Sequence, residues 1–444
     1  MKVKKIILVI LLLVLCLGFI DELSQRFDIY QKVINKNLSN SSIDNSITLE
    51  WNYTWGGIEN EVGRGIALDS LGNIYITGYY PTIEGLGPSL AIFLAKFNNL
   101  GQFQWNRTFN QQGDDIAYSI TIDSGNNIYV GGTSEDNGDN DLIIIKYNNL
   151  GDYLGNITWD NGPNDVCVGI ALDSAENIYA TGYSFNMSNE FDSDLILIKF
   201  DNLGNVQYNY TWGRNREDFG SRIVLDSSNN IYLTGQYARS SGTDICLLKY
   251  NNLGVFQWNR TLDKNNFEYG TGIALDSSEN VYVSGITLVG SPTNYDMVLI
   301  KYNNAGTMLW NRTWGKTGVE ITTDIAINSE DTIYLAGFVN YSAAQLNDFC
   351  LVQFNANGEQ QYNHTWGGPK HDQWRAITVD SSNNIFLAGL TGSFGAGDVD
   401  VELAKYSMSV DKTDGMEIHA YDLSLLVLCS MLIIGIIIKR KLKH

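Results

Sequence analysis

The chain alternates apolar and polar stretches in a pattern that occurs seven times: an apolar strand end, a polar turn, a second apolar strand and a closing glycine. Residues 225–235 are a clear copy of this pattern. An aromatic residue stands at the centre of every copy, and successive copies lie 50 to 54 residues apart. These aromatic residues are Tyr75, Tyr129, Tyr179, Tyr232, Tyr282, Tyr334 and Phe386. Because such a period is typical of solenoids, propellers and repeat arrays, we predict one repetitive domain.

Each repeat contains four short apolar segments separated by turn residues. In a typical copy the first segment ends in a form of Gly-Ile-Ala-Leu-Asp, the second reads Asn-Ile-Tyr-x-x-Gly, the third ends in Lys and an aromatic residue, and the fourth carries Asn-x-Thr, preceded by Trp in four copies. Four short strands per unit are typical of a propeller blade. The turn aspartate recurs in six copies and is Asn328 in the other, which favours a role in the turn backbone over a calcium site.

The seventh repeat ends after its third strand, and the missing strand stands at the other end of the domain. Residues 49–56 precede the first full repeat and match the fourth strand at residues 309–315. An N-terminal strand that completes the last blade would remove free sheet edges. We therefore predict an all-β fold over residues 47–406: a seven-bladed β-propeller of four-stranded antiparallel blades, closed by this N-terminal strand.

The repeat as a whole resembles a known family. The series Asp-Ser-x-x-Asn-Ile-Tyr-x-x-Gly, then Asp-x-x-x-x-Lys-Tyr, then an aromatic fourth strand resembles the SBBP (seven-bladed β-propeller) repeat of prokaryotic surface and secreted proteins. The NHL repeat is similar in the turn and second strand, but it has an aspartate where this chain keeps its glycine. The SBBP resemblance covers about residues 47–406; it implies an extracytoplasmic propeller and supplies no catalytic motif.

The two ends of the chain have the patterns of targeting and membrane segments. Residues 1–20 combine lysines with an apolar run and predict a signal peptide or N-terminal membrane segment. Residues 21–46 are a polar spacer, and residues 407–422 are a polar linker. Residues 423–438 predict a C-terminal transmembrane anchor, and the basic residues 439–444 predict a cytoplasmic tail. This topology places a membrane-anchored propeller outside the cell.

Net charge and cysteine content limit which partners and which metal or disulfide chemistry we expect. The formal charge of −20 argues against nucleic acid, because phosphate binding needs a basic face. Five cysteines form neither a disulfide framework nor a metal-binding spacing, and we expect Cys167, Cys246 and Cys350 to be buried thiols. A lipoprotein would use Cys16 as its acylated residue, but Leu15 is bulky where that motif needs a small side chain. We expect no cofactor and no metal site.

Catalytic motifs are sparse. The four histidines form no His-Glu-x-x-His motif, and the chain has no Gly-x-Ser-x-Gly and no Cys-His pair. We therefore predict a non-enzymatic cell-surface module that binds or adheres to a surface glycan or protein. Two alternatives stay open. One is an extracellular carbohydrate-active enzyme that uses a pair of carboxylates, and the other is a structural component of the envelope.

The connections of variable length predict where a ligand would bind. Those from the second to the third strand, and from the fourth strand to the next blade, emerge on one side of the disc. Binding residues concentrate on loops that a rigid scaffold holds. The aromatic candidates on this variable-loop face are Tyr80, Tyr183, Phe185, Tyr237, Tyr341 and Phe394. Half-buried loop anchors are the alternative interpretation.

A recurring acid stands eight residues before each turn Asp or Asn. The seven acids are Glu61, Asp115, Asp165, Asp218, Glu268, Glu320 and Asp372. If the first strand lines a central channel, these carboxylates ring its mouth, where their mutual repulsion would attract cations. Alternatively, each carboxylate accepts hydrogen bonds from backbone amides at the start of its own strand.

The fourth strand carries a formal N-glycosylation acceptor, Asn-x-Thr, in every repeat. Strand alternation places the large aromatic side chains on one side and the Asn and Thr side chains on the outer, solvent-facing side. The candidate glycosylation sites are Asn52, Asn106, Asn156, Asn209, Asn259, Asn311 and Asn363. The alternative is that these residues are edge-strand residues copied with the repeat.

Overall fold

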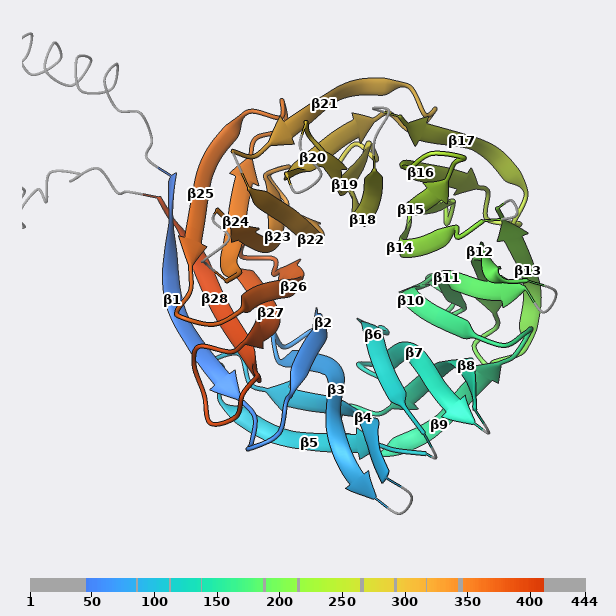
Figure 1. Cartoon of the computed structure of the whole chain (residues 1–444), viewed down its shortest axis with the longest axis horizontal. Helices are drawn as coiled ribbons and strands as arrows, with labels where there is room; N and C mark the ends of the chain where they lie inside the picture. The colour runs from blue at the N-terminus through green and yellow to red at the C-terminus, as the bar shows by residue number, and fades with distance from the viewer. Residues whose placement is uncertain are drawn as a thin grey trace, which may run out of the picture. The chain divides into compact units, whose positions relative to one another are not determined.

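Sheets arranged around a central axis make up the described part of the chain (Figure 1). The computed structural model describes residues 45–410 apart from 85–86, 112, 137, 187–188, 214–215, 264–266, 291–293, 317 and 342–345. Within this part the compact unit runs from Ile47 to Ser407. The segments predicted at residues 1–20, 423–438 and 439–444 lie outside the described residues, as do most of the spacer and the linker. No helix in the described part has the length and hydropathy to cross a membrane.

The strands fall into four positions from the axis to the rim. The innermost are β2 (Val62–Leu68), β6 (Asp115–Ile122), β10 (Asp165–Leu172), β14 (Phe219–Leu225), β18 (Glu268–Leu275), β22 (Val319–Ile327) and β26 (Asp372–Val379). The second are β3 (Ile74–Glu84), β7 (Ile128–Asp136), β11 (Ile178–Asn186), β15 (Ile231–Ala238), β19 (Val281–Leu288), β23 (Ile333–Asn340) and β27 (Ile385–Thr391).

The third and outermost positions complete each repeat. The third strands are β4 (Gly87–Phe97), β8 (Asp139–Tyr147), β12 (Asn189–Phe200), β16 (Thr243–Tyr250), β20 (Tyr295–Tyr302), β24 (Asp348–Phe354) and β28 (Asp400–Val410). The outermost are β1 (Asn45–Trp55), β5 (Phe103–Phe109), β9 (Tyr153–Trp159), β13 (Val206–Trp212), β17 (Phe256–Leu262), β21 (Met308–Trp314) and β25 (Gln360–Trp366).

Hydrogen bonding groups these strands into antiparallel, four-stranded units. Five sheets have four strands each, and strands β18 to β25 form one sheet of eight. Within that larger sheet the two sets of four meet through a single parallel pair, Tyr295 with Val319. The predicted all-β propeller of four-stranded antiparallel blades is confirmed, although hydrogen bonding does not divide the strands into seven separate sheets.

The predicted closing strand is present. Strand β1 lies beside β28, so the N-terminal strand completes the sheet that contains β28, β27 and β26 (Figure 1). Asn52 Nδ2 on β1 donates to Glu402 Oε1 on β28 at 2.8 Å. Ser407 Oγ donates to the carboxylate of Glu50. Two segments some 350 residues apart in sequence therefore close the ring.

The apolar core lies between neighbouring sheets. One cluster packs Phe93 of β4 against Ala388 and Leu403 of β27 and β28. Close strand packing also explains the recurring glycine of the second strand, because a Cβ at Gly78 would lie 1.8 Å from the Val62 carbonyl oxygen. The cysteines Cys167, Cys246 and Cys350 are buried and free, as predicted.

The turn aspartate accepts hydrogen bonds from several polar groups of its own repeat. Asp69 Oδ1 accepts hydrogen bonds from the backbone amides of Leu71 and Asn73 at 3.0 and 2.8 Å. Its Oδ2 accepts from Asn73 Nδ2 at 2.7 Å and from the Tyr75 hydroxyl at 3.2 Å. Lys96 Nζ lies 3.8 Å from the same oxygen. The aspartate therefore joins the turn to the second and third strands.

Neighbouring turns are also joined to each other. Glu279 has a φ of 59°, a left-handed conformation that costs a non-glycine residue about 1–2 kcal/mol. Its Oε1 accepts from the Ser227 backbone amide of the preceding repeat at 3.0 Å. Asp331, with a φ of 58°, makes the equivalent bonds to Ser277. These bonds between repeats offset the backbone cost.

Each innermost strand contains a β-bulge at the same position. Pairing with the second strand skips one residue, as between Gly63 and Gly65 of β2. The skipped residues are Arg64, Tyr118, Val168, Ser221, Thr271, Thr323 and Arg375. A bulge leaves its extra residue out of the ladder and re-aims the side chain. This position is therefore the one at which the repeat presents a side chain toward the axis.

We expect Asp226→Ala to lower the free energy of unfolding by about 2–4 kcal/mol, because one buried and three partly buried donors would lose their acceptor. These donors are the amides of Ser228 and Asn230, the Asn230 side chain and the Tyr232 hydroxyl. Denaturant unfolding measures the change, with Ser228→Ala as the control. A variant as stable as the parent would show that the turn aspartate is dispensable.

We also expect closure of the ring to weaken as pH rises. Burial, aided by the nearby carboxylates of Asp372 and Asp400, raises the pKa of Glu402 from 4.5 to about 7. A raised carboxyl pKa means that the folded state holds its proton more tightly, so this stability is present below about pH 4.5 and is lost as pH rises through about 7. Between pH 5 and pH 8, the Tm of Glu402→Gln should therefore fall by on the order of 2–4 °C less than the Tm of the parent.

The control for this pH experiment is Glu359→Gln, which removes an exposed carboxylate from the turn after β24. Its melting temperature should fall with pH as that of the parent does. Equal pH dependence in parent and Glu402→Gln would contradict the role given to Glu402.

Candidate functional site

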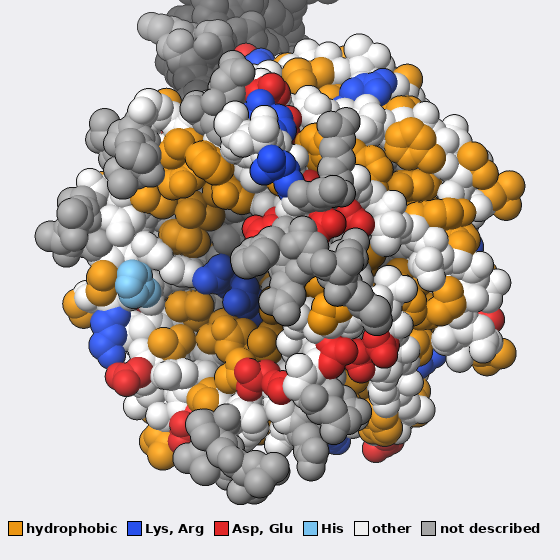
Figure 2. Space-filling model, turned by 45° about the vertical axis from the view of Figure 1, so that its right-hand side comes forward, with side chains coloured by type: hydrophobic (Ala, Val, Ile, Leu, Met, Phe, Trp, Pro, Cys, Tyr) orange, Lys and Arg blue, Asp and Glu red, His pale blue; other side chains and the backbone are white. Residues whose placement is uncertain are grey.

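A central channel runs between the innermost strands. It forms a cavity of about 260 Å³, and every innermost strand contributes to its lining. The lining residues are Arg64, Tyr118, Val168, Ser221, Arg222, Thr271, Ile321, Thr322, Thr323 and Arg375. All seven bulge residues are among them, so the bulges position the channel side chains. Figure 2 shows Lys and Arg side chains near the middle of one face, bordered by hydrophobic ones.

One arginine of the channel has a carboxylate partner. Arg222 Nε on β14 lies 3.7 Å from Asp324 Oδ1 on β22, and its Nη1 donates to the Val168 carbonyl at 3.2 Å. Asp324 also accepts from the backbone amides of Ile325 and Ile377 at 3.0 and 3.3 Å. Burial raises the pKa of Asp324, and the Arg222 cation opposes that shift. This wall of the channel is therefore electrically balanced.

Two other arginines face the channel from neighbouring strands. The Arg64 guanidinium lies 5.6 Å from the ring centres of Tyr79 and Tyr118, and that of Arg375 lies 6.0 Å from Phe338. Burial lowers the pKa of Arg375 to about 10, and the neighbouring Arg64 cation adds to that shift. Sequence reasoning missed both residues, although they break the repeat at a position that is otherwise uncharged.

The seven recurring acids lie at or next to the start of the innermost strands, where they are at most 7% exposed. None of them lines the channel cavity. Most accept hydrogen bonds from the chain entering their own strand, as Asp115, Asp165 and Asp372 do from the amides of residues 111, 161 and 368 at 2.6, 2.6 and 2.8 Å. Burial raises the pKa of Asp165 to about 6. This geometry favours the amide-binding interpretation, and attraction of cations stays a prediction.

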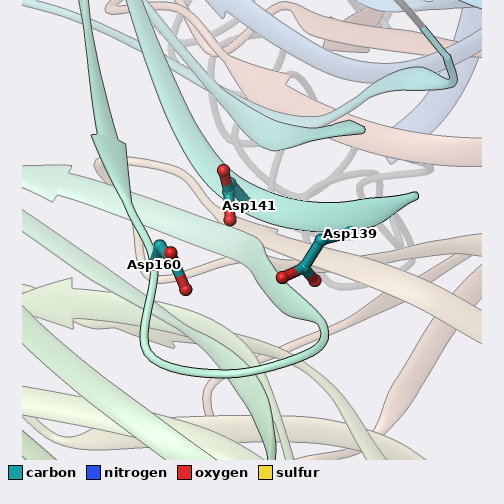
Figure 3. A group of neighbouring side chains, drawn as sticks. All are labelled: Asp139, Asp141 and Asp160. Atoms are coloured by element: carbon teal, nitrogen blue, oxygen red, sulfur yellow. The ribbon is translucent and has the colours of Figure 1, made fainter. Parts of the chain in front are cut away.

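A group of acids that the sequence analysis did not single out lies next to the loop between β9 and β10. Asp139 and Asp141 on β8 and Asp160 after β9 each place a carboxylate oxygen within 4.8 Å of the others (Figure 3). Oxygen ligands of this kind suit Ca²⁺. Asp160 stands where Gly56, Gly213, Gly315 and Gly367 follow the fourth strand in other repeats. That break in the repeat was the available signal.

A second acidic group arises in the same way. Asp263 also replaces the glycine after the fourth strand, and it lies with Asp244 and Glu268. Arg239 pairs with two members of this group, with Nε 2.6 Å from Asp244 and Nη1 3.0 Å from Asp263. The two groups therefore differ in charge balance despite their equivalent positions.

The aromatic candidates of the variable-loop face are largely anchored in the scaffold. The Tyr183 ring lies edge-on to Phe219, with centres 4.6 Å apart, and also contacts Phe185. Tyr237 packs against Trp212 at 5.0 Å. The Tyr80 hydroxyl lies 3.1 Å from Thr108 Oγ1. These four candidates are half-buried, as anchors would be, but they lie on the second strands β3, β11 and β15 and not in the loops.

The other two candidates, Tyr341 and Phe394, are each 36% exposed. Phe394 ends a column of rings in which it stacks on Trp366 at 5.0 Å, Trp366 on Phe349 at 4.9 Å, and Phe349 on the buried Trp374 at 4.0 Å. Lys316 Nζ lies 5.6 Å from the Tyr341 ring centre. Phe394 therefore stands on a stacked support, whereas Tyr341 has a cation near its ring.

The rim has the predicted alternation in most repeats, although Tyr53 and Tyr210 on the aromatic side are also exposed. All seven Asn residues of the fourth-strand acceptors are exposed, and so are their Thr partners. Trp51, Trp105, Trp258 and Trp310 are half-buried and pack against the cores. Asn52 differs from the other acceptors because it also holds Glu402 in the closing sheet. The exposed side chains are geometrically able to accept a glycan.

Comparison with known proteins shows which sequences and structures this chain resembles. The regulatory protein FlaEY of Caulobacter vibrioides is 24% identical over 111 residues, which are 22% of this chain and 12% of that protein. An ulvan lyase, described as a polysaccharide lyase, has a TM-score of 0.52 at 11% identity and covers 81% of this chain and 98% of its own. The same lyase bound to -[GlcA(1-4)Rha3S]- gives a TM-score of 0.51 with the same identity and coverage.

At these identities the lyase shares only the propeller fold, and the FlaEY match leaves most of that protein unaligned. A model of the SBBP β-propeller repeat matches residues 55–79, from the end of β1 into β3. The resemblance to the SBBP repeat is confirmed at this copy, and the described part of the chain has the strand arrangement of a β-propeller.

Proposed function

We propose that this protein is a cell-surface propeller, held in the membrane through residues 423–438, that binds a surface glycan or protein through its variable-loop face. The aromatic column ending at Phe394 carries this proposal. An exposed ring backed by three stacked rings gives a ligand a flat apolar surface that loses little conformational entropy on binding. Tyr341 offers a second exposed ring near the cation of Lys316.

The function proposed is binding rather than catalysis. The carboxylates at the start of the innermost strands are buried and largely occupied by backbone amides, which leaves them poorly placed to reach a substrate. A carbohydrate-active enzyme that uses acids of the variable-loop face is the second candidate. A structural envelope component is the third.

The complete ring is proposed to have seven blades, with strands β18 to β25 counting as two. Tyr295 and Val319, which join the two halves of that sheet, form one parallel pair. Equivalent parallel bridges occur at four other junctions: Asn60 with Val399, Asn140 with Asn164, Ser193 with Glu217, and Thr243 with Phe267. A single such bridge is therefore a contact between blades rather than a continuation of one sheet.

A glycan and surface-protein array, probed with the fragment 47–406, tests the proposed function. We expect Tyr341→Ala combined with Phe394→Ala to weaken binding at least about tenfold with little change in Tm, because both rings are partly exposed. Leu203→Ser is the control, since Leu203 is 83% exposed and lies in the turn between β12 and β13. Full binding by the double variant, or turnover of a polysaccharide on the array, would contradict the proposal.

We further propose that the rim asparagines carry glycans. Peptide mass spectrometry on protein from the native host should find modified asparagine at the exposed positions, among them Asn106, Asn259 and Asn363. Thr261→Ala should remove the modification at Asn259 alone, because the acceptor needs its hydroxyl residue. Unmodified asparagine at all seven positions would refute a glycosylated rim without affecting the fold.

A further inference from the structure

The bulge position of the innermost strands is uncharged in five repeats and arginine in two. The five uncharged residues are Tyr118, Val168, Ser221, Thr271 and Thr323, and the two arginines are Arg64 and Arg375. The arginines stand on β2 and β26, which are neighbours where the ring closes. Because the arginines occur in only two adjacent repeats, the blade fold does not require them. They therefore indicate a function at this place in the channel.

Arg64 and Arg375 are half-buried, and their guanidinium groups lack the partners that cations inside a protein usually have. The Nε atoms of Arg64 and Arg375 are both buried and have no hydrogen-bond acceptor among the described residues. Within that part of the chain, neither side chain lies within 4.0 Å of a carboxylate oxygen. Arg375 Nη2 donates to Gln373 Oε1, and Arg64 rests between two tyrosine rings. Most of their donors therefore remain available.

The opposite wall shows how this protein satisfies an arginine when no ligand is involved. Arg222 has Asp324 as its ion-pair partner and two backbone carbonyls as further acceptors. The charged residues named in the channel are thus three arginines against one aspartate, an excess of two positive charges in a chain whose formal charge is −20. Buried charges are normally paired. An anion between Arg64 and Arg375 would provide the missing partner.

We propose that Arg64 and Arg375 form an oxyanion-binding site inside the channel. Planar guanidinium forks match the oxygens of carboxylate, sulfate and phosphate groups, and the rings of Tyr79 and Tyr118 lie 5.6 Å from the Arg64 guanidinium. The cavity of about 260 Å³ is just below the ~300–1,000 Å³ of pockets for drug-sized ligands. The site therefore takes one inorganic oxyanion or one acidic group of a larger molecule. It is separate from the aromatic rings of the proposed function and does not depend on them.

Isothermal titration of the full chain with sodium sulfate and with sodium glucuronate, at constant ionic strength set by chloride, tests this site. We expect saturable binding at one site per chain. A sulfate-only response identifies a site for tetrahedral anions, and a glucuronate-only response identifies a carboxylate site. Arg64→Gln and Arg375→Gln should each weaken binding at least about tenfold, because each removes one fork of the pair.

Arg260→Gln is the matched control, since it removes one positive charge from the fourth strand β17, away from the channel lining. It should bind the anion as the parent does. Both channel variants should fold, because each relieves repulsion between two cations and leaves the Arg222 pair intact. Crystals of the parent soaked in selenate give a readout without any variant, with anomalous density expected between Arg64 and Arg375.

Three results would overturn the proposal. They are non-saturable heats with both anions, channel variants that bind as tightly as the parent, and an equal loss of binding in Arg260→Gln, which would indicate a general charge effect. Selenate-soaked crystals without a peak between the two guanidinium groups would do the same.

Discussion

Six of the seven repeats depend on one buried or half-buried carboxylate at the turn between the first and second strands. That carboxylate accepts two backbone amides, an asparagine side chain and a tyrosine hydroxyl, with a lysine nearby, as seen at Asp69. The sixth repeat supports this account, because it carries Asn328 in place of the aspartate and Gln353 in place of the lysine. Removing both charges together avoids a buried charge without its partner, which is the costly case.

Contacts between repeats convert these units into a ring. On one face, a turn residue in the left-handed conformation reaches the serine of the preceding turn, as Glu279 reaches Ser227. At the rim, Arg107 stacks on Trp105 and donates from Nε to the Gly151 carbonyl of the next repeat at 2.7 Å. The β1–β28 pair supplies the remaining junction. Repeated contacts hold the scaffold at the turns, at the rim and at the closing sheet. Single positions in the channel and the loops can therefore differ from one repeat to the next.

Sequence periodicity predicted most of the fold because the seven copies of the repeat can be aligned with one another. The strand order, the closing strand at residues 49–56 and the outward-facing asparagines such as Asn259 all follow from spacing and two-residue alternation. The channel arginines were not predicted, since a bulge moves one residue out of the ladder and its place is invisible to simple alternation. The positions of the recurring acids were predicted, but their burial was not. Asp165 and its counterparts are covered by connections between strands, and the packing of these connections does not follow from residue spacing. Likewise, residue spacing places Tyr183 in a loop, whereas it lies on β11 with Phe219 packed edge-on against its ring.

Exchange of the first strand is the central claim, and moving that strand tests it most directly. Equilibrium unfolding should be compared among the parent, a chain without residues 45–55, and a chain that carries residues 45–55 after β28 through a short Gly-Ser connection. The account predicts a single cooperative transition for the parent and the relocated form. The deleted form should aggregate or lose cooperativity, because β28 would become an unpaired edge. A deleted form that stays monomeric and melts within a degree or two of the parent would contradict closure by the N-terminal strand.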